Sequence, residues 1–259
     1  MNELVGVLTL LTGIAYTLLG VLTAYDLVTE RRNRGRSYFG LAFLAMAATC
    51  GPHHLACAVH ILFEGDAARP SHLAALLIAL PPGATFVYLR LEVMLGGRGE
   101  RFIAGAPAWL IALPWLTTLV AGAVLWAAWQ NAREYSPLWV ASNAVLLVAY
   151  TVVGVLILHT QVARFRSRGG WSLAGISFGM VFPTCGVAHA AASLNAHVDW
   201  HLLLIDGLGV PASLYFLWVV RGIHRDTLRD WNRSPLVGAA GNARRSSPWR
   251  AAPAGVSER

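Results

Sequence analysis

Lysine is absent from this chain of 259 residues, and charge of either sign is scarce. Only 13% of the residues are charged and 56% are hydrophobic, whereas roughly 25% charge is usual in soluble proteins. The mean hydropathy is +0.54. So apolar a composition excludes an ordinary soluble domain. It predicts an integral membrane protein embedded in a lipid bilayer.

Cysteine is also scarce. Cys50, Cys57 and Cys185 all lie in apolar stretches, which argues against a framework of disulfides. The first residues lack the basic start and small-residue cleavage site of a signal peptide, so we expect them to form a retained first span. The net charge of +7 comes from arginines in loops and in the tail. This distribution indicates orientation in a membrane and no binding of nucleic acid.

Seven apolar stretches are long enough to cross the ~30 Å hydrocarbon core of a bilayer. We expect the spans at 4–27, 38–62, 72–95, 103–129, 137–162, 172–196 and 201–223. Eighteen of the twenty arginines fall on one side of this arrangement, against Arg69 and Arg133 on the other. The positive-inside rule therefore predicts the N-terminus outside and the C-terminus inside. The expected protein is a multi-pass protein of a bacterial inner (plasma) membrane.

A repeat relates the first three expected spans to the last three. The matched residues are Ala15-Tyr16-Thr17 with Ala149-Tyr150-Thr151, Gly40 with Gly175, Thr49-Cys50-Gly51 with Thr184-Cys185-Gly186, and His72 with His201. A single connecting span keeps both units in the same orientation, so we expect a two-fold axis along the membrane normal. The predicted fold is all-α and integral to the membrane, with seven transmembrane helices. Two parallel three-helix repeats (1–100 and 135–225) are joined by a linker helix (101–134), and a disordered cytoplasmic tail follows at 226–259.

The motif Cys-Gly-x-x-His occurs in both units, as Cys50 with His54 and as Cys185 with His189. A Cys and a His four residues apart lie on one face of a helix, one turn apart. Thiolate and imidazole are costly to leave unpaired in hydrocarbon, and together they favour Cu(I), or Zn(II) in a tetrahedral site. If the two-fold axis brings the second and sixth spans together, the four side chains converge. Whether they form one shared site or two stays open at this point.

Other polar residues of the spans are candidates for supporting roles. Histidines gather toward the expected outer side, which suggests that the bound species arrives from there. Cys57 extends the stripe of Cys50 and His54 and is either an auxiliary ligand or a packing residue. The candidates for an auxiliary or second site are Cys57, His53, His72, His201, His197 and Asp199. The candidates for contacts to the ligand residues are Tyr16, Tyr150, Asn143 and Asp206.

These residues resemble a known family. A first span with Ala-Tyr, a basic loop and a second span with Cys-Gly-x-x-His are similar to the three-helix membrane sensor domain of ethylene receptors and related bacterial histidine kinases. That resemblance implies copper(I) held by Cys50, His54, Cys185 and His189, with Tyr16 and Tyr150 at the family's first-helix tyrosine. Here the domain stands as a tandem duplication without a kinase, and Asn143 replaces the family's first-helix acid.

We therefore predict a membrane metal-binding protein that acts as a sensor or a metal-handling component, with a signalling or membrane-protein partner on the cytoplasmic side. Three alternatives stay open. One is a transporter of small solutes or metal, because the 3+1+3 layout is also that of small sugar transporters of the SWEET type. A second is a haem protein with paired histidines as axial ligands. A third is a copper redox enzyme, although no nucleophile–base constellation supports a catalytic site.

Overall fold

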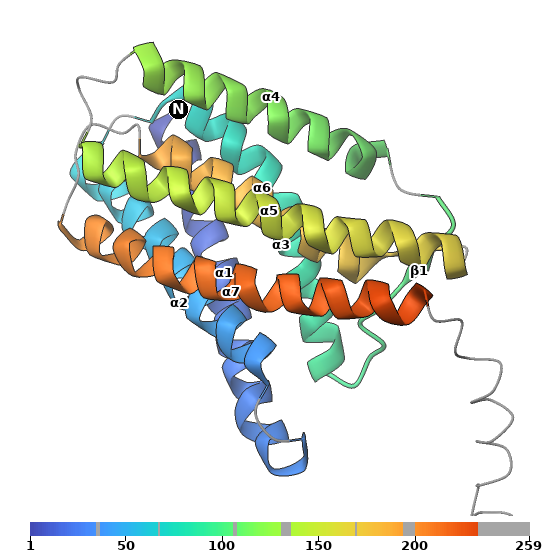
Figure 1. The fold of residues 1–259 in the computed structure, drawn as a ribbon. Coiled ribbons are helices and arrows are strands. Elements are labelled where there is room, and N and C mark those ends of the chain that lie inside the picture. The colour runs from blue at the N-terminus through green and yellow to red at the C-terminus, as the bar shows by residue number, and fades with distance from the viewer. Residues whose placement is uncertain are drawn as a thin grey trace, which may run out of the picture.

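A computed structural model describes residues 1–34, 37–66, 68–105, 108–130, 136–168, 170–193 and 200–232. Seven α-helices dominate it (Figure 1). They are α1 (Asn2–Arg34), α2 (Tyr38–Val59), α3 (Pro70–Met94), α4 (Ala108–Gln130), α5 (Pro137–Arg168), α6 (Leu173–Ala192) and α7 (Trp200–Asn232). A short π-helix, η1 (His60–Glu64), continues α2.

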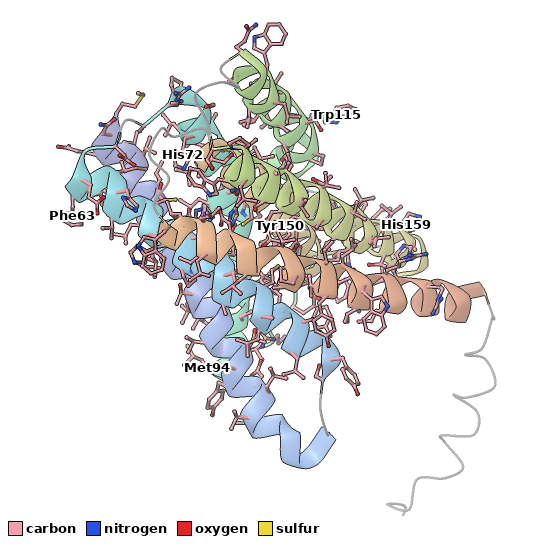
Figure 2. All side chains as sticks on the ribbon, turned by 60° about the vertical axis from the view of Figure 1, so that its left-hand side comes forward. Phe63, His72, Met94, Trp115, Tyr150 and His159 are labelled. Carbon is pink, nitrogen blue, oxygen red and sulfur yellow. The ribbon has the colours of Figure 1, made fainter. Side chains whose placement is uncertain are left out.

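Six of these helices are long and apolar enough to cross a membrane, namely all except α4. In the described part of α4 the apolar stretch is shorter, Ala112–Ala127. Large apolar side chains such as Leu11, Val148 and Trp218 are exposed, as expected for helices that face lipid. Trp115 on α4 likewise points away from the bundle (Figure 2). The prediction of an all-α protein of the membrane type is confirmed at this level.

Several expected boundaries are wrong. The fourth span was expected from residue 103 and the sixth from residue 172, but Phe102–Ile103 (β1) and Trp171–Ser172 (β2) pair as a two-stranded antiparallel sheet. Glu100 accounts for part of this difference, because its carboxylate accepts hydrogen bonds from the Ser172 hydroxyl (2.8 Å) and the Ala174 backbone amide (3.4 Å). Helix α7 also continues to Asn232, past residue 226 where the tail was expected to begin. The remainder of that expected tail, 233–259, lies outside the described residues.

The packing of the bundle is the same for both expected units. Helix α1 packs on α2 and α3, and α5 packs on α6 and α7. Each third helix also crosses to the other unit, since α3 contacts α6 and α7 contacts α2. Helix α4 lies outside this group, against α3 and α6 (Figure 1). This exchange of contacts is what a two-fold axis would produce, while the repeat itself stays a prediction.

The helices that carry the two Cys-Gly-x-x-His motifs begin in the same way. Ser37 caps α2 by accepting a hydrogen bond from the Gly40 amide (3.0 Å), and Ser172 caps α6 by accepting one from the Gly175 amide (2.9 Å). A serine side chain at this position satisfies an amide that the helix itself leaves unpaired. The two helices therefore start at matched positions, which places Cys50 and Cys185 at the same distance along them.

The glycine of each motif allows a first helix to approach closely. A Cβ atom at Gly51 would lie 2.7 Å from the backbone nitrogen of Thr17 on α1. A Cβ atom at Gly186 would lie 3.1 Å from the Cα atom of Leu147 on α5. Small residues at such crossings let membrane helices pack backbone to backbone.

Candidate metal centre

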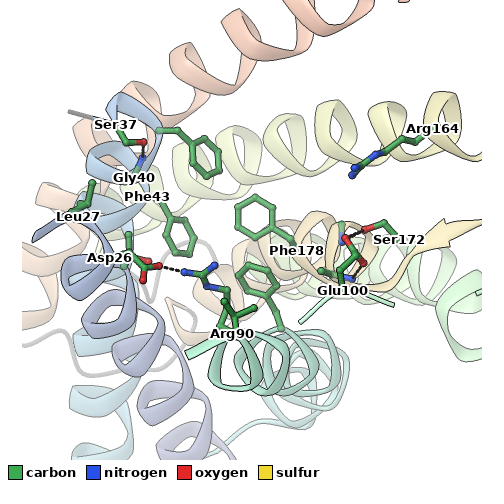
Figure 3. A pocket seen from close by; sticks show the side chains of 16 residues that line it. Asp26, Leu27, Ser37, Gly40, Phe43, Arg90, Glu100, Arg164, Ser172 and Phe178 are labelled. Atoms are coloured by element: carbon green, nitrogen blue, oxygen red, sulfur yellow. Dashed lines mark hydrogen bonds and ion pairs between the residues drawn. The ribbon is translucent and has the colours of Figure 1, made fainter. Parts of the chain in front are cut away.

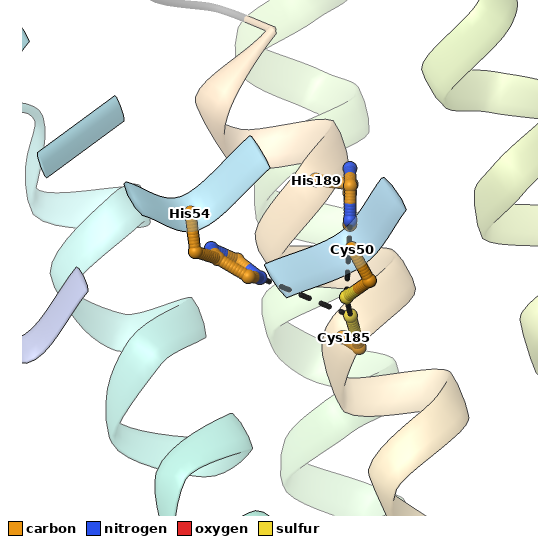
Figure 4. Close-up of side chains that lie close together, drawn as sticks. All are labelled: Cys50, His54, Cys185 and His189. Carbon is orange, nitrogen blue, oxygen red and sulfur yellow. Dashed lines mark hydrogen bonds between the residues drawn. The ribbon is translucent and has the colours of Figure 1, made fainter. Parts of the chain in front are cut away.

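The two motifs meet in the middle of the bundle (Figure 4). Cys50 and His54 on α2 face Cys185 and His189 on α6, and one donor atom from each lies within 4.8 Å of the others. All four side chains are buried. The second and sixth helices thus bring the four predicted ligands into a single group that could hold a metal ion.

Each histidine faces the thiol of the opposite helix. His189 Nε2 lies 3.5 Å from Cys50 Sγ, and His54 Nε2 lies 3.9 Å from Cys185 Sγ. The two Sγ atoms are 2.8 Å apart, and both cysteines are free. The Cys and His that are neighbours in each sequence motif are therefore not the Cys and His that contact each other. Each helix supplies one sulfur and one nitrogen, and the contacts cross between the helices.

The chemistry of these donors fits a soft metal ion. Two sulfurs and two imidazole nitrogens form the ligand set of many tetrahedral metal sites. Buried side-chain nitrogens without hydrogen-bond partners are costly in an apolar interior. His54 Nδ1 is such an atom among the described residues. A metal ion at its Nε2 atom would leave the proton on Nδ1 and would not satisfy that atom, so the support for a metal ion comes from the donors that face one another.

Asp206 on α7 is the buried carboxylate beside this group. Its Oδ2 atom accepts hydrogen bonds from Trp139 Nε1 (2.6 Å) and Asn143 Nδ2 (2.8 Å), both on α5. Its Oδ1 atom lies 2.7 Å from His53 Nδ1 and 3.5 Å from His189 Nδ1. Asp206, which the sequence suggested as a contact to ligand residues, thus lies 3.5 Å from His189. Asn143, suggested for the same role, contacts Asp206 and reaches a ligand residue only through it.

His53 and Cys57 lie on the other side of Asp206. Cys57 Sγ is 3.6 Å from His53 Nε2, and the His53 ring stacks on that of His189 with 3.9 Å between centroids. His53, His189 and Asp206 form a second buried group that could hold a metal ion. His189 belongs to both groups, since its two ring nitrogens face opposite ways. Cys57 also packs against Trp139, Ala192 and Leu202.

The matched tyrosines lie next to the histidines. The Tyr16 ring is 5.7 Å from that of His54, and the Tyr150 ring is 6.1 Å from that of His189. Both hydroxyls are buried and have no hydrogen-bond partner among the described residues. They border a cavity of about 10 Å³, which both thiols also line. The apolar residues around it are Leu19, Phe43, Met46, Ala47, Val181 and Phe182.

Among the described residues, His72 and His201 do not belong to these two groups. His72 is buried on α3 (Figure 2), whereas His201 on α7 is exposed and stacks on Trp200 with 3.6 Å between ring centroids. The two rings thus lie in different surroundings, and the expected second pair of His72 and His201 stays a prediction. His197 and Asp199 lie outside the described residues.

Sequence reasoning missed two features of the centre. Trp139 was not a candidate, since one tryptophan at the start of an apolar helix gives no signal of a buried hydrogen bond. Met46, one turn before Cys50, was read as part of an apolar span, and it lines the small cavity beside the thiols. Its position one turn from Cys50 is a signal that could have been used.

Comparisons with known proteins do not assign this centre. No family model matches the chain, and no curated protein or solved structure matches it. The arrangement of the residues themselves therefore carries the functional argument.

Proposed function

We propose that this chain is a membrane metal-binding protein in which Cys50, His54, Cys185 and His189 together hold one soft metal ion. The observation that carries the proposal is the convergence of four buried donors from two helices within 4.8 Å. In so apolar a bundle, buried thiols and imidazoles are costly unless they are paired or hold a ligand.

Copper(I) is the ion we propose. Soft thiolates select Cu(I) and Zn(II) over harder cations, and imidazole suits both. Two thiolates would neutralise Zn(II) and would leave Cu(I) with a net negative charge, so copper favours one thiol that keeps its proton. The resemblance to the sensor domain of ethylene receptors supports copper. The direct test is to offer the metal-free protein Cu(I) and Zn(II) together and to measure which ion it binds.

Four protein donors suit storage, sensing or transfer of an ion better than catalysis, because catalytic sites usually keep a coordination position for water or substrate. Bound copper would supply a soft Lewis-acid centre. The chain itself orients the donors. Asp206 lies against His189 Nδ1, a position in which a carboxylate fixes a ligating histidine so that its Nε2 faces the metal. We propose a role as a sensor or a metal-handling component of the membrane, which works with a cytoplasmic partner.

Reconstitution of the purified protein tests this function. The metal-free protein is incubated without oxygen with Cu(I), with Zn(II) and with both, and bound metal is counted per chain. We expect the wild type to retain copper and the double variant Cys50→Ala/Cys185→Ala to lose it. Cys57→Ala is the matched control, because Cys57 lies outside the four-donor group. Equal metal content in the wild type and the double variant would contradict the proposal.

The close approach of the two sulfurs raises a second candidate, a redox-active thiol pair. The variant His54→Ala/His189→Ala separates the two functions. A metal centre loses its ion when both imidazoles are removed, whereas a disulfide between Cys50 and Cys185 needs no imidazole and would still form under mild oxidation.

A further inference from the structure

A much larger cavity, of about 690 Å³, lies at one end of the bundle (Figure 3). Helices α1, α2, α3, α5 and α6 line it at the end where α1 stops and α6 starts. The C-terminal part of α7 lies at the same end, because His224 contacts His159 on α5 (3.1 Å), close in sequence to the cavity residue Arg164. We call this the Arg-rich end, since most arginines are expected there.

The rim of this cavity is charged and rich in oxygen. Arg90 on α3 forms an ion pair with Asp26 on α1, and neither side chain is fully buried. Glu100 lies across from them, and Arg164 also lines the wall (Figure 3). Among the described residues that line the cavity, none carries sulfur or imidazole. It therefore suits passage of a soft metal ion or of a small carrier, because it offers nothing to hold such an ion tightly.

The floor of the cavity is aromatic. Phe43, Phe86 and Phe178 line it, with 5.5 Å between the rings of Phe43 and Phe178 and 4.8 Å between those of Phe86 and Phe178. Phe43 also lines the small cavity beside the two thiols. Phe43 is the one described residue that lines both cavities, so its side chain lies between the large cavity and the thiols.

Soft donors follow directly behind Phe43. Phe43, Met46 and Cys50 lie three, four and seven residues apart on α2, which places them along one face of the helix. Met46 and both thiols line the small cavity together. A thioether binds soft ions and has a flexible side chain. An ion that passed Phe43 would therefore meet Met46 before it reached Cys50.

We propose that the centre exchanges its metal ion with the Arg-rich end of the bundle, through the large cavity, with Phe43 as the gate and Met46 as the intermediate ligand. The inference rests on the proposed function, because it concerns how that ion arrives. This route is the reverse of the one expected from the distribution of histidines, which suggested that the ion arrives from the opposite end. Cu(I) passes by ligand exchange from the thiolate of a carrier to the donors of the protein: the protein thiol that binds it gives its proton to the freed carrier thiolate, and no oxidation state changes.

Extraction of copper from one side of a membrane tests the route. The copper-loaded protein is placed in sealed vesicles whose sidedness is established by protease protection of a C-terminal tag. A membrane-impermeant, sulfonated Cu(I) chelator is then added outside. We expect copper to leave only where the Arg-rich end faces the chelator, and Phe43→Ala to speed its loss by roughly tenfold or more, because a closed gate must open locally first.

Phe39→Ala is the matched control. Phe39 lies one turn before Phe43 on α2 and lines the large cavity without reaching the small one. It should leave the rate of loss near that of the wild type. Met46→Leu should slow the loss while the copper bound at equilibrium changes little. Copper loss only from the opposite end, or equal rates for Phe43→Ala and Phe39→Ala, would overturn the route.

A second measurement does not depend on metal. In the metal-free protein with Cys57→Ala as background, an impermeant cationic thiol reagent should modify Cys50 and Cys185 from the Arg-rich end, and faster with Phe43→Ala. Modification from the opposite end alone would overturn the route even if copper binds. If the thiols react from the Arg-rich end but the protein binds no copper, the proposed function fails and the path through the cavity stands.

Discussion

Asp206 on α7 supports one of the two site histidines, since its Oδ1 atom lies 3.5 Å from Nδ1 of His189. Neither Nδ1 atom makes a well-formed hydrogen bond, but among the described residues no carboxylate contact is found for Nδ1 of the matched histidine, His54. The two histidines therefore occupy equivalent positions in the sequence but differ in their surroundings. Outer contacts of this kind set the tautomer and the basicity of a ligating imidazole.

Replacement of Asp206 by asparagine should weaken metal binding. Loss of an outer contact of this kind typically costs about 10–100-fold in affinity, and we expect a decrease in that range for Asp206→Asn. Competition with a coloured Cu(I) chelator measures it. Asp26→Asn is the control, because Asp26 lies at the large cavity and pairs with Arg90. An equal affinity for Asp206→Asn and Asp26→Asn would show that Asp206 does not support the centre.

The effect of Asp206 should pass through His189. In a double-mutant cycle, the effects of mutations at contacting residues are coupled, whereas the effects of mutations at distant residues are additive. We expect Asp206→Asn to cost little further affinity once His189→Ala has been made, and to keep its full effect in combination with His54→Ala. The same chelator competition gives all the affinities. Equal coupling of Asp206 to the two histidines would contradict the asymmetry.

The tyrosine hydroxyls should act differently in the two metal states. Tyr16 and Tyr150 carry buried hydroxyls without partners among the described residues, and removal of an unsatisfied buried hydroxyl costs nothing or stabilises. Tyr16→Phe and Tyr150→Phe should therefore leave the metal-free protein at least as stable as the wild type. If a hydroxyl donates to a metal-bound thiolate, its loss should reduce the stabilisation by metal by about 1–2 kcal/mol. Thermal unfolding with and without Cu(I) measures both effects. A loss of stability confined to the metal-free protein would argue against a contact between the hydroxyl and a metal-bound thiolate.

Gly51→Ala should disrupt the crossing of α1 and α2. The added methyl would lie 2.7 Å from the Thr17 backbone nitrogen, and overpacking of this kind costs about 1–3 kcal/mol. Gly122→Ala is the control, because nothing lies within 4 Å of its Cβ position on α4 and alanine favours helix. Unfolding in detergent should show Gly51→Ala less stable than the wild type and Gly122→Ala as stable or more so. The reverse order would mean that the close crossing is not present.

The four donors could be found from the sequence because their spacing repeats. A Cys and a His one turn apart occur twice in apolar segments, and this repeat alone predicts Cys50, His54, Cys185 and His189 as ligands. Asp206 was also visible, since a carboxylate is rare within a span. Both signals depend only on the cost of polar groups in hydrocarbon.

The partners of these residues could not be predicted. In a membrane helix, the faces toward lipid and toward the core are both apolar, so the sequence does not show how the helix is rotated. The cross-pairing of His189 with Cys50, the contact of Asp206 with His53, and the exposure of His201 all depend on that rotation. The pairing of Phe102–Ile103 with Trp171–Ser172 was also hidden, because both segments read as the apolar starts of spans.

The central claim is that one metal ion is shared by the two motifs, and X-ray absorption of the copper-loaded protein tests it most directly. With one Cu(I) per chain, the spectrum should require both sulfur and nitrogen ligands. It should lose sulfur in Cys185→Ala and in Cys50→Ala alike, because one ion contacts both helices. Two ions per chain, each of which keeps its sulfur when the other motif is mutated, would contradict a shared centre.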